Sequence, residues 1–209
     1  MAYHYGFEIE GFDTDPKTHD PIIPSKKISS FDKDGFPGLV EVRTSGGNPC
    51  IYQAGFELLR HMAKYPLVRF DIHEHVFSGK EKNLLRQEQT SKQPVTINNV
   101  YGKSPRLLGN KTLASLQINI SNCLAPSYTN KDGVVFPARY GLLDINRIVR
   151  NLDDLFRVYI KNSNRQPGFY AIKDNGIRLE YRSLPNFVMT QGIYMLHGML
   201  TNIKNIVEG

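Results

Sequence analysis

Five stretches of the chain alternate between apolar and polar residues, and this alternation limits what the chain can fold into. A strand points successive side chains to opposite faces, so each stretch predicts a strand with one buried and one polar face. A weaker sixth stretch, 169–173, runs into Asp174-Asn175-Gly176, where Asn-Gly favours a hairpin turn and hence an antiparallel pair. The five predicted strands are 5–12, 39–44, 67–77, 113–121 and 177–184.

Three other stretches, 50–64, 143–161 and 186–207, repeat apolar residues with the period of an α-helix. Asn48 and Asn186 stand where helix N-caps are expected. Strands with antiparallel pairing and three helices predict an α+β fold, with the helices on one face of the sheet and the other face open. No repeat or linker divides the sequence, so we expect a single domain over 1–209.

The composition is that of an ordinary globular protein. Of the 209 residues, 40% are hydrophobic and 22% are charged, which excludes a chain that is disordered throughout. No apolar run approaches the ~20 residues that a membrane-spanning helix needs, and the first residues do not resemble a signal peptide. Two cysteines cannot build a disulfide framework. These features together predict a cytoplasmic protein without a membrane partner.

Positive charge is concentrated in one polar stretch. The formal net charge is +6, and residues 78–112 hold seven Lys and Arg against two Glu. Loops longer than ~12–15 residues are commonly lids or binding loops. The stretch therefore predicts a basic insertion or lid loop over a phosphate-bearing partner, with a solvated loop that only adds solubility as the alternative.

The polar side of the predicted strands differs from that of an ordinary exposed sheet, which carries Thr, Lys, Ser and mixed charges. Carboxylates, amides, imidazoles and guanidiniums predominate, and lysine is missing although the chain contains many. Carboxylate and amide oxygens suit Mg²⁺, and interleaved arginines suit phosphate or carboxylate groups. This face is a candidate active site, and an exposed face without function is the alternative.

Several short motifs resemble one enzyme family. Gly6-Phe7-Glu8-Ile9-Glu10 and Leu39-Val40-Glu41-Val42-Arg43 resemble two acidic strands of the amidoligases, which are relatives of glutamate–cysteine ligase in the glutamine synthetase-like superfamily. The stretch 177–187 contains Glu180-Tyr181-Arg182-Ser183-Leu184-Pro185-Asn186 and is similar to the Glu-Tyr-Arg-x-Leu-x-Asn signature of phage and bacterial COOH–NH2 ligases. Arg165 and Gly168-Phe169-Tyr170 stand where that family often has an Arg and a Tyr-Gly stretch.

The resemblance implies a curved, largely antiparallel glutamine synthetase-like sheet whose open polar face is the active site. It also implies ATP- and Mg²⁺-dependent ligation of a small-molecule or peptide carboxylate to an amine through an acyl phosphate, and relatives of this kind often form homo-oligomers. By the same resemblance, the Mg²⁺ ligands would be Glu8, Glu10, Glu41 and Glu180. The catalytic guanidiniums would be those of Arg182, Arg178 and Arg43, and the nucleotide or substrate would contact Gln117, Asn119, Arg165 and Tyr170.

One departure and two alternatives accompany this prediction. Gln117-Ile118-Asn119 stands where many members carry a His-x-His strand, and amides are weaker metal ligands than carboxylates. The first alternative is a catalytically degenerate relative that binds a peptide or metabolite on the same face. The second is a basic nucleic-acid-binding protein, which only the charge supports.

A further candidate lies on the predicted strand 67–77, where Asp71, His73 and His75 share one face. A His-x-His pair on a strand can bind zinc. A polar rim of the ligase site and a plain solvated edge are the alternatives.

Overall fold

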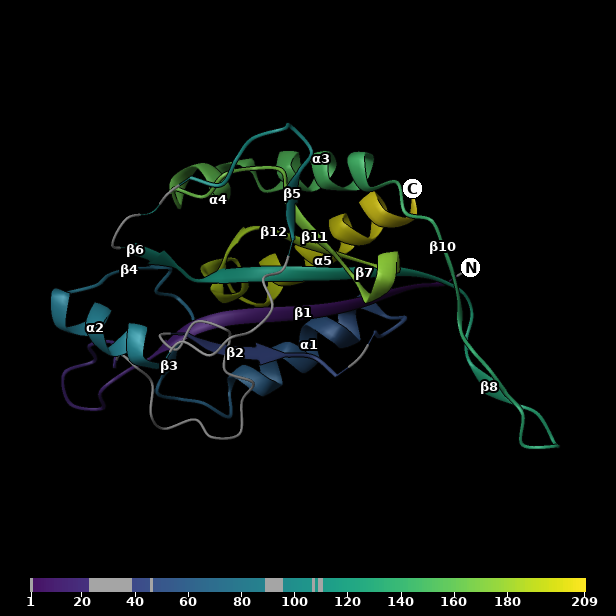
Figure 1. Cartoon of the computed structure of the whole chain (residues 1–209), viewed down its shortest axis with the longest axis horizontal. Helices are drawn as coiled ribbons and strands as arrows, with labels where there is room; N and C mark the ends of the chain where they lie inside the picture. The colour runs from purple at the N-terminus through teal and green to yellow at the C-terminus, as the bar shows by residue number, and fades with distance from the viewer. Residues whose placement is uncertain (1, 23–38, 46, 89–95, 107, 109–110) are drawn as a thin grey trace.

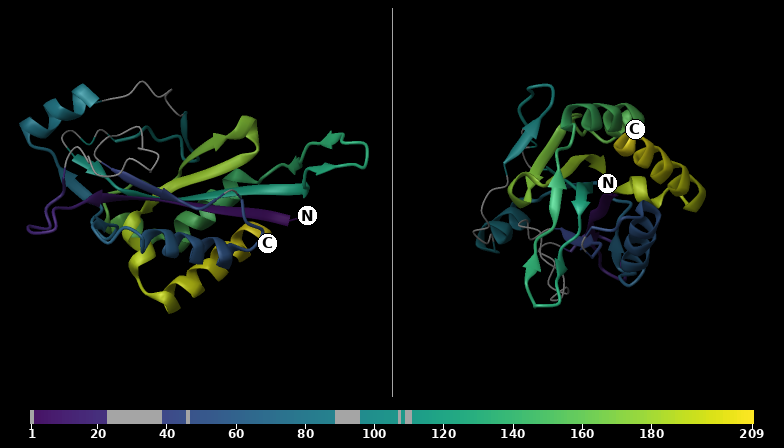
Figure 2. Two further views of the ribbon diagram at one scale, coloured as in Figure 1. Left: turned by 90° about the horizontal axis from the view of Figure 1, so that it is seen from below. Right: turned by 90° about the vertical axis from the view of Figure 1, so that its right-hand side faces the viewer.

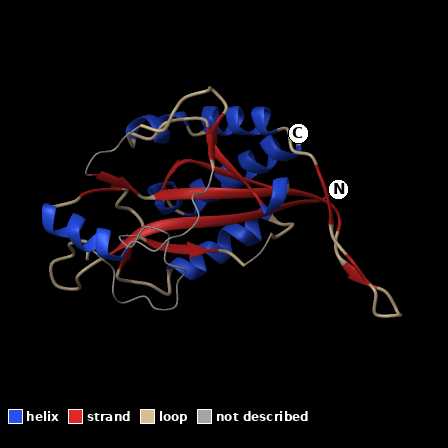
Figure 3. Cartoon of the chain, in the orientation of Figure 1, coloured by secondary structure: helices blue, strands red, loops and turns tan. Residues whose placement is uncertain are grey.

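The computed structural model describes residues 2–22, 39–45, 47–88, 96–106, 108 and 111–209. They form an α+β fold with an eight-stranded sheet (Figures 1 and 3). Six strands follow the order β2-β1-β7-β12-β11-β5, and every pairing between them is antiparallel. Their bounds are β1 (Ala2–Asp13), β2 (Val40–Arg43), β5 (Ile97–Asn99), β7 (Ser115–Ala125), β11 (Phe169–Lys173) and β12 (Arg178–Pro185), while β3 (Val68–Arg69) pairs with β1 and β10 (Arg139–Gly141) pairs with β7.

A layer of helices covers one face of the sheet (Figure 2). It consists of α1 (Ile51–Met62), α3 (Ile145–Leu155), α4 (Arg157–Asn162) and α5 (Ile193–Glu208). Apolar strand residues such as Phe7, Ile118 and Leu179 are fully buried in one core with Leu58 and Leu200 from the helices. The other side chains of each strand therefore point to the opposite face, as the alternation predicts. In the described part of the chain, every helix is too short or too polar to cross a membrane.

The prediction of one continuous strand over 67–77 is wrong. β3 pairs with β1, whereas β4 (Glu74–Val76) leaves the main sheet and pairs with β6 (Lys111–Leu113). At the end of β3, Arg69 donates from Nε and Nη2 to the carboxylate of Asp71, at 2.7 and 2.5 Å. The chain changes its pairing partner here, so Asp71, His73 and His75 do not share the face of one strand.

Two predicted helices have different boundaries in the structure. The stretch 143–161 forms two helices because Phe156, with φ −102° and ψ 14°, interrupts the helical backbone. The helix expected from Asn186 begins at Ile193, after a 3-10 helix η2 (Asn186–Thr190) and a turn at Gly192. A φ of 94° at Gly192 is a conformation that favours glycine. Asn186 therefore does not cap this helix.

The basic stretch 78–112 is not a single loop. It contains α2 (Gly79–Glu88), β5 at the edge of the main sheet, and β6. Residues 89–95, 107 and 109–110 lie outside the described residues. The lid over a phosphate-bearing partner stays a prediction that the structure does not test.

An arm that was not predicted connects β7 to β10. It ends in a hairpin of β8 (Tyr128–Thr129) and β9 (Val135–Phe136), which projects beyond the sheet (Figures 1 and 2). The rings of Tyr128 and Phe136 stack with centroids 4.7 Å apart. A two-stranded hairpin is marginally stable by itself, and this cross-strand stack is the kind of contact that stabilises one.

Candidate functional site

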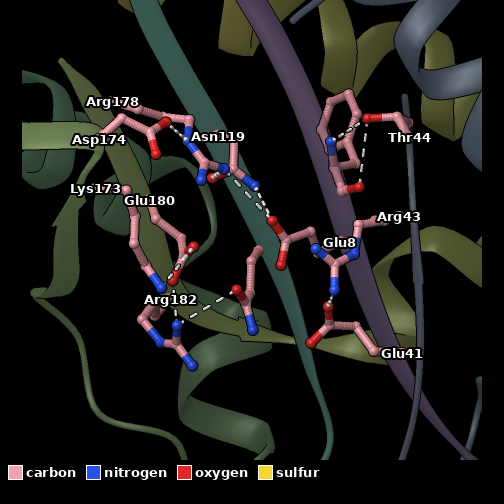
Figure 4. A network of polar contacts seen from close by, with 12 residues as sticks. Glu8, Glu41, Arg43, Thr44, Asn119, Lys173, Asp174, Arg178, Glu180 and Arg182 are labelled. Carbon is pink, nitrogen blue, oxygen red and sulfur yellow. Dashed lines mark hydrogen bonds and ion pairs between the residues drawn. The ribbon is translucent and has the colours of Figure 1, made fainter. Parts of the chain in front are cut away.

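The polar side chains of β1, β2, β7 and β12 share the sheet face opposite the helix layer (Figure 4). The antiparallel register places Glu8 opposite Arg43 of β2 and opposite Gln117 of β7. Glu180 of β12 lies opposite Asn119 of β7. Directly opposed residues of paired strands point to the same face, so the structure brings together the residues that the alternation selected.

Asn119 connects an acid to a guanidinium at the centre of this face (Figure 4). Its Nδ2 donates to Glu8 Oε1 at 3.0 Å, and its Oδ1 accepts from Arg178 Nη1 at 2.7 Å. Arg178 also lies 3.5 Å from Glu8 Oε1 and donates from Nε to Asp174 at 2.8 Å. The side chain of Asn119 thus acts as donor and acceptor at once, which an amide does without any metal ion.

Glu180 is buried, with 2% of its side chain exposed, and its charge is compensated by two cations. It forms an ion pair with Arg182, and its Oε2 lies 3.7 Å from Lys173 Nζ. Arg182 also donates from Nη1 to Gln117 Oε1 at 3.4 Å. A buried carboxylate without such partners would be strongly destabilising, so Glu180 and the two cations form one unit.

The other two acids of the face are held as well. Glu10 is buried, and its Oε2 accepts from the backbone N and the Oγ of Ser115, at 2.6 and 2.7 Å. Glu41 lies opposite Glu10 in the register and forms an ion pair with Arg43 at 2.9 Å. These contacts offset the repulsion between two directly opposed carboxylates.

The acids do not gather into a magnesium site. Glu8, Gln117, Asn119 and Glu180 offer carboxylate and amide oxygens, which are the ligands that Mg²⁺ prefers. Among the residues that the structure describes, however, no group of three or more His, Cys, Asp or Glu side chains could hold a metal ion. The amide oxygens of Gln117 and Asn119 also already accept hydrogen bonds from guanidinium groups. The donor types fit the ion but their arrangement does not, so magnesium held by these side chains stays a prediction, and below magnesium appears only as the ion that accompanies ATP.

Arg165 reaches the polar face, whereas Tyr170 does not. Arg165 donates from Nη1 to the carbonyl of Arg182 at 3.0 Å and from Nη2 to the carbonyl of Leu113 at 2.9 Å. Tyr170 lies opposite Tyr181, whose side chain belongs to the helix-covered core. Tyr170 therefore lies on the other face from Glu180, because neighbouring residues of a strand point to opposite faces, and its contact with a nucleotide or substrate stays a prediction.

A hollow of about 350 Å³ opens on the polar face beside Glu8, and we name it the Glu8 hollow. Two guanidiniums, from Arg43 and Arg178, and two carboxylates, from Glu8 and Asp174, contribute to its lining. Asn119 also lines it. The hollow can thus hold an anionic group and a cationic group side by side.

Four residues at this face were not predicted, and two of them carry a signal in the sequence. His4 and Tyr140 line the Glu8 hollow together with Asp174, and Lys173 contacts Glu180. His4 has the same parity in β1 as Glu8, so extending the alternation towards the N-terminus finds it. Sorting 169–173 in the same way finds Lys173, which corrects the expectation that lysine is missing from this face.

The two histidines of the predicted strand 67–77 do not assemble a zinc site in the described part of the chain. His75 Nε2 lies 3.1 Å from Glu81 Oε1 in α2. His73 packs edge-on against Phe187, with ring centroids 5.2 Å apart, and burial lowers the pKa of His73. Each histidine is accounted for by contacts within the protein.

Comparison of the chain with family models, with curated proteins and with solved structures found no match. The function is therefore inferred from the residues of this face and from the resemblance of their motifs.

Proposed function

We propose that this protein is an ATP-dependent carboxylate–amine ligase of the amidoligase type, with a glutamine synthetase-like sheet. The observation that carries the proposal is one face on which four adjacent strands gather carboxylates, amides and guanidiniums around the Glu8 hollow. Phosphoryl transfer requires mainly positioning and charge compensation, and such a face supplies both. The motif resemblance of β1, β2 and β12 supports the same reaction.

In the proposed reaction, a carboxylate oxygen of one substrate attacks the γ-phosphorus of ATP, which forms an acyl phosphate and releases ADP. The amine of the second substrate then attacks the acyl carbon, gives up a proton and expels inorganic phosphate. Arg43 and Arg178 would bind phosphoryl oxygens in the Glu8 hollow. Glu8 and Asp174, which face the same space, would attract the protonated amine and accept the two protons that it loses, one before it attacks the acyl carbon and one as the amide forms. Magnesium enters this proposal as the ion that accompanies ATP.

A binding protein without catalytic activity is the second candidate, and one observation favours it. Each of the four predicted metal ligands already has a partner within the protein: Asn119 for Glu8, Ser115 for Glu10, Arg43 for Glu41 and Arg182 for Glu180. A face closed by such contacts can select a ligand without activating it. Nucleic-acid binding rests on charge alone and stays an untested alternative.

The test is an assay of phosphate release from Mg²⁺–ATP in the presence of pooled amino acids and polyamines, with mass spectrometry to detect an amide product. We expect amine-dependent turnover, and we expect chelation of Mg²⁺ by EDTA to stop it. Glu180→Gln should lower turnover at least about 100-fold, because Arg182 and Lys173 lose the charge that fixes them. Asp154→Asn is the matched control, since that exposed acid pairs with Arg157 in the helix layer.

Two results would contradict the proposal. Full turnover in Glu180→Gln, with an unchanged circular dichroism spectrum, refutes the role of Glu180. Absence of ATP turnover with every pool, together with tight nucleotide-independent binding of one compound, establishes the binding protein instead.

A further inference from the structure

A second hollow, of about 270 Å³, lies on the same sheet face around Glu10 rather than Glu8. We name it the Arg165 hollow. Three guanidiniums line it, those of Arg106, Arg165 and Arg182, against the single carboxylate of Glu10. The lining therefore carries two more positive than negative charges, which the mixed lining of the Glu8 hollow does not.

The charge of Glu10 is already engaged within the protein. Its Oε2 accepts two hydrogen bonds from Ser115, and Gln117 Nε2 lies 3.4 Å from its Oε1. A carboxylate that accepts several hydrogen bonds is held in one orientation. The carboxylate of Glu10 is thus fixed by neutral donors, and the excess positive charge of the three guanidiniums remains for a ligand to match.

Arg165 is the most constrained of the three guanidiniums. Both of its Nη atoms donate to backbone carbonyls, whereas its buried Nε has no hydrogen-bond partner among the described residues. Burial lowers the pKa of Arg165 to about 10, so the group still carries its charge at neutral pH. The charge of Glu10 opposes this effect of burial, so Glu10 is a counter-charge for Arg165, and the lining as a whole keeps an excess of positive charge.

The remaining lining is mixed, with five apolar residues beside the polar Ser115, Asn164 and Gln166. Phe169 and Leu113 belong to it, together with Ile97, Pro105 and Leu108. A ligand with one anionic group on an apolar body matches both the charge and the surface.

We propose that the Arg165 hollow binds an organic carboxylate, with its carboxylate group at the guanidiniums of Arg106 and Arg182 beside Arg165, and its apolar body against Phe169 and Leu113. Planar guanidiniums bind carboxylates through paired hydrogen bonds. The identification of this ligand as the carboxylate that is activated rests on the proposed function. The binding itself requires no nucleotide.

The experiment is calorimetric titration of the full chain, without ATP, with 4-phenylbutyrate as the probe and 4-phenylbutanamide as its neutral counterpart. We expect the acid to bind at least tenfold more tightly than the amide. Arg106→Gln should weaken binding of the acid about tenfold and leave the amide unaffected, because a charge-assisted hydrogen bond is lost. Arg106 is exposed and its side chain lies at the surface, so this variant leaves the fold intact. Arg157→Gln, on the exposed side of α4, is the matched control.

Three results would overturn the inference. Equal affinity for the acid and the amide would show that the charge of the ligand does not contribute to binding. Equal affinity for the acid in Arg106→Gln and Arg157→Gln would show that the acid does not bind in this hollow. Tighter binding of inorganic phosphate than of 4-phenylbutyrate would show that the hollow is a phosphate site and not a carboxylate site. If the acid binds as expected but ATP is never consumed, the ligase proposal fails and the carboxylate site stands.

Discussion

Asn186 joins three segments of the chain through one buried side chain. Its Nδ2 donates to the carbonyl of Glu10 in β1 at 3.1 Å and to the carbonyl of Ile72, between β3 and β4, at 2.7 Å. Without the amide, two carbonyls in the interior lose their donor, and each such loss costs about 1–3 kcal/mol. Asn186 thus holds the backbone at Glu10, a residue of the polar face, to the segment between β3 and β4.

We expect Asn186→Ala to lower the free energy of unfolding by about 2–4 kcal/mol, measured by urea denaturation. Gln191→Ala is the control, because that exposed amide also donates to a carbonyl, of Phe187 at 3.2 Å, and should change stability by less than about 0.5 kcal/mol. Equal losses in the two variants would show that the buried hydrogen bonds of Asn186 contribute nothing extra.

Asn186 and Tyr170 also show what a sequence conceals at the scale of a residue. An Asn between a strand and a helix has the pattern of an N-cap, and its true partner Glu10 lies 176 residues away. Tyr170 belongs to a motif but has the wrong parity for the polar face. Local patterns place a residue on an element, whereas long-range partners are decided by tertiary packing.

Helices α1 and α5 approach each other closely at Gly55. A Cβ added there would lie 2.6 Å from Leu200 Cδ1, so a side chain at this position would force the buried Leu200 to move. Gly198 in α5 offers the opposite case, because nothing lies within 4 Å of a Cβ added there.

The expected effects of Gly→Ala therefore differ in sign between the two sites. Gly198→Ala should stabilise the protein by about 0.5–1 kcal/mol through helix propensity, whereas Gly55→Ala should destabilise it by about 1–3 kcal/mol through overpacking. In a Leu200→Ala background, which alone costs about 2–5 kcal/mol, Gly55→Ala should become neutral or stabilising. Additive free energies of unfolding across this double-mutant cycle would contradict the contact.

At the scale of elements, regular hydrophobic periodicity predicts where strands and helices lie. It does not predict where an element is broken into two. The alternation predicted β1, β2, β7 and β12 and the face that they share, because one buried face fixes the parity of each strand. The break at Phe156 and the division of 67–77 into β3 and β4 depend on which partners the chain meets. The basic stretch was predicted as a loop because its charges obscure α2.

For the whole molecule, one buried pair links the sheet to the helix layer. Tyr181 of β12 donates to Asp153 of α3 at 2.7 Å. Burial is the main cause that raises the pKa of Asp153, and the hydrogen bond from Tyr181 opposes it. An acid whose pKa is raised in the folded state binds more protons there than in the unfolded state, so its contribution to stability is lost as the pH rises through the folded-state pKa.

We expect Asp153→Asn to remove this loss, because a neutral amide keeps an acceptor for Tyr181 and carries no charge to bury. The free energy of unfolding of the native protein should fall relative to Asp153→Asn as the pH rises from 4 to 8, measured by urea denaturation at each pH. Asp154→Asn removes the same charge from an exposed position and should change the slope much less than Asp153→Asn, because the charge of Asp154 is only a minor cause of the raised pKa of Asp153. Parallel curves for the native protein and Asp153→Asn would show that Asp153 contributes no such dependence.

The fold and the composition of the polar face could be predicted at this scale, whereas the state of its acids could not. Alternation shows that Glu8, Glu10, Glu41 and Glu180 share a face. It does not show that each one is held by a cation, an amide or a serine, because those contacts depend on rotamers and on cross-strand register. Glu10, Arg165 and Arg182 were predicted as site residues, but nothing in the sequence indicated that they line one hollow with Arg106, because the lining comes from loops as well as strands.

The central position of β7 has a consequence for how the chain is made. The first strand pairs with β2 soon after it is synthesised, but its other neighbour, β7, begins only at Ser115. During translation, the backbone groups on the edge of β1 that will pair with β7 therefore lack this partner until the intervening segments have emerged from the ribosome. Pairings of such high contact order fold slowly, and an open strand edge invites association with other chains. Production of this protein should therefore depend on chaperones and on slow synthesis more than its final stability alone would suggest.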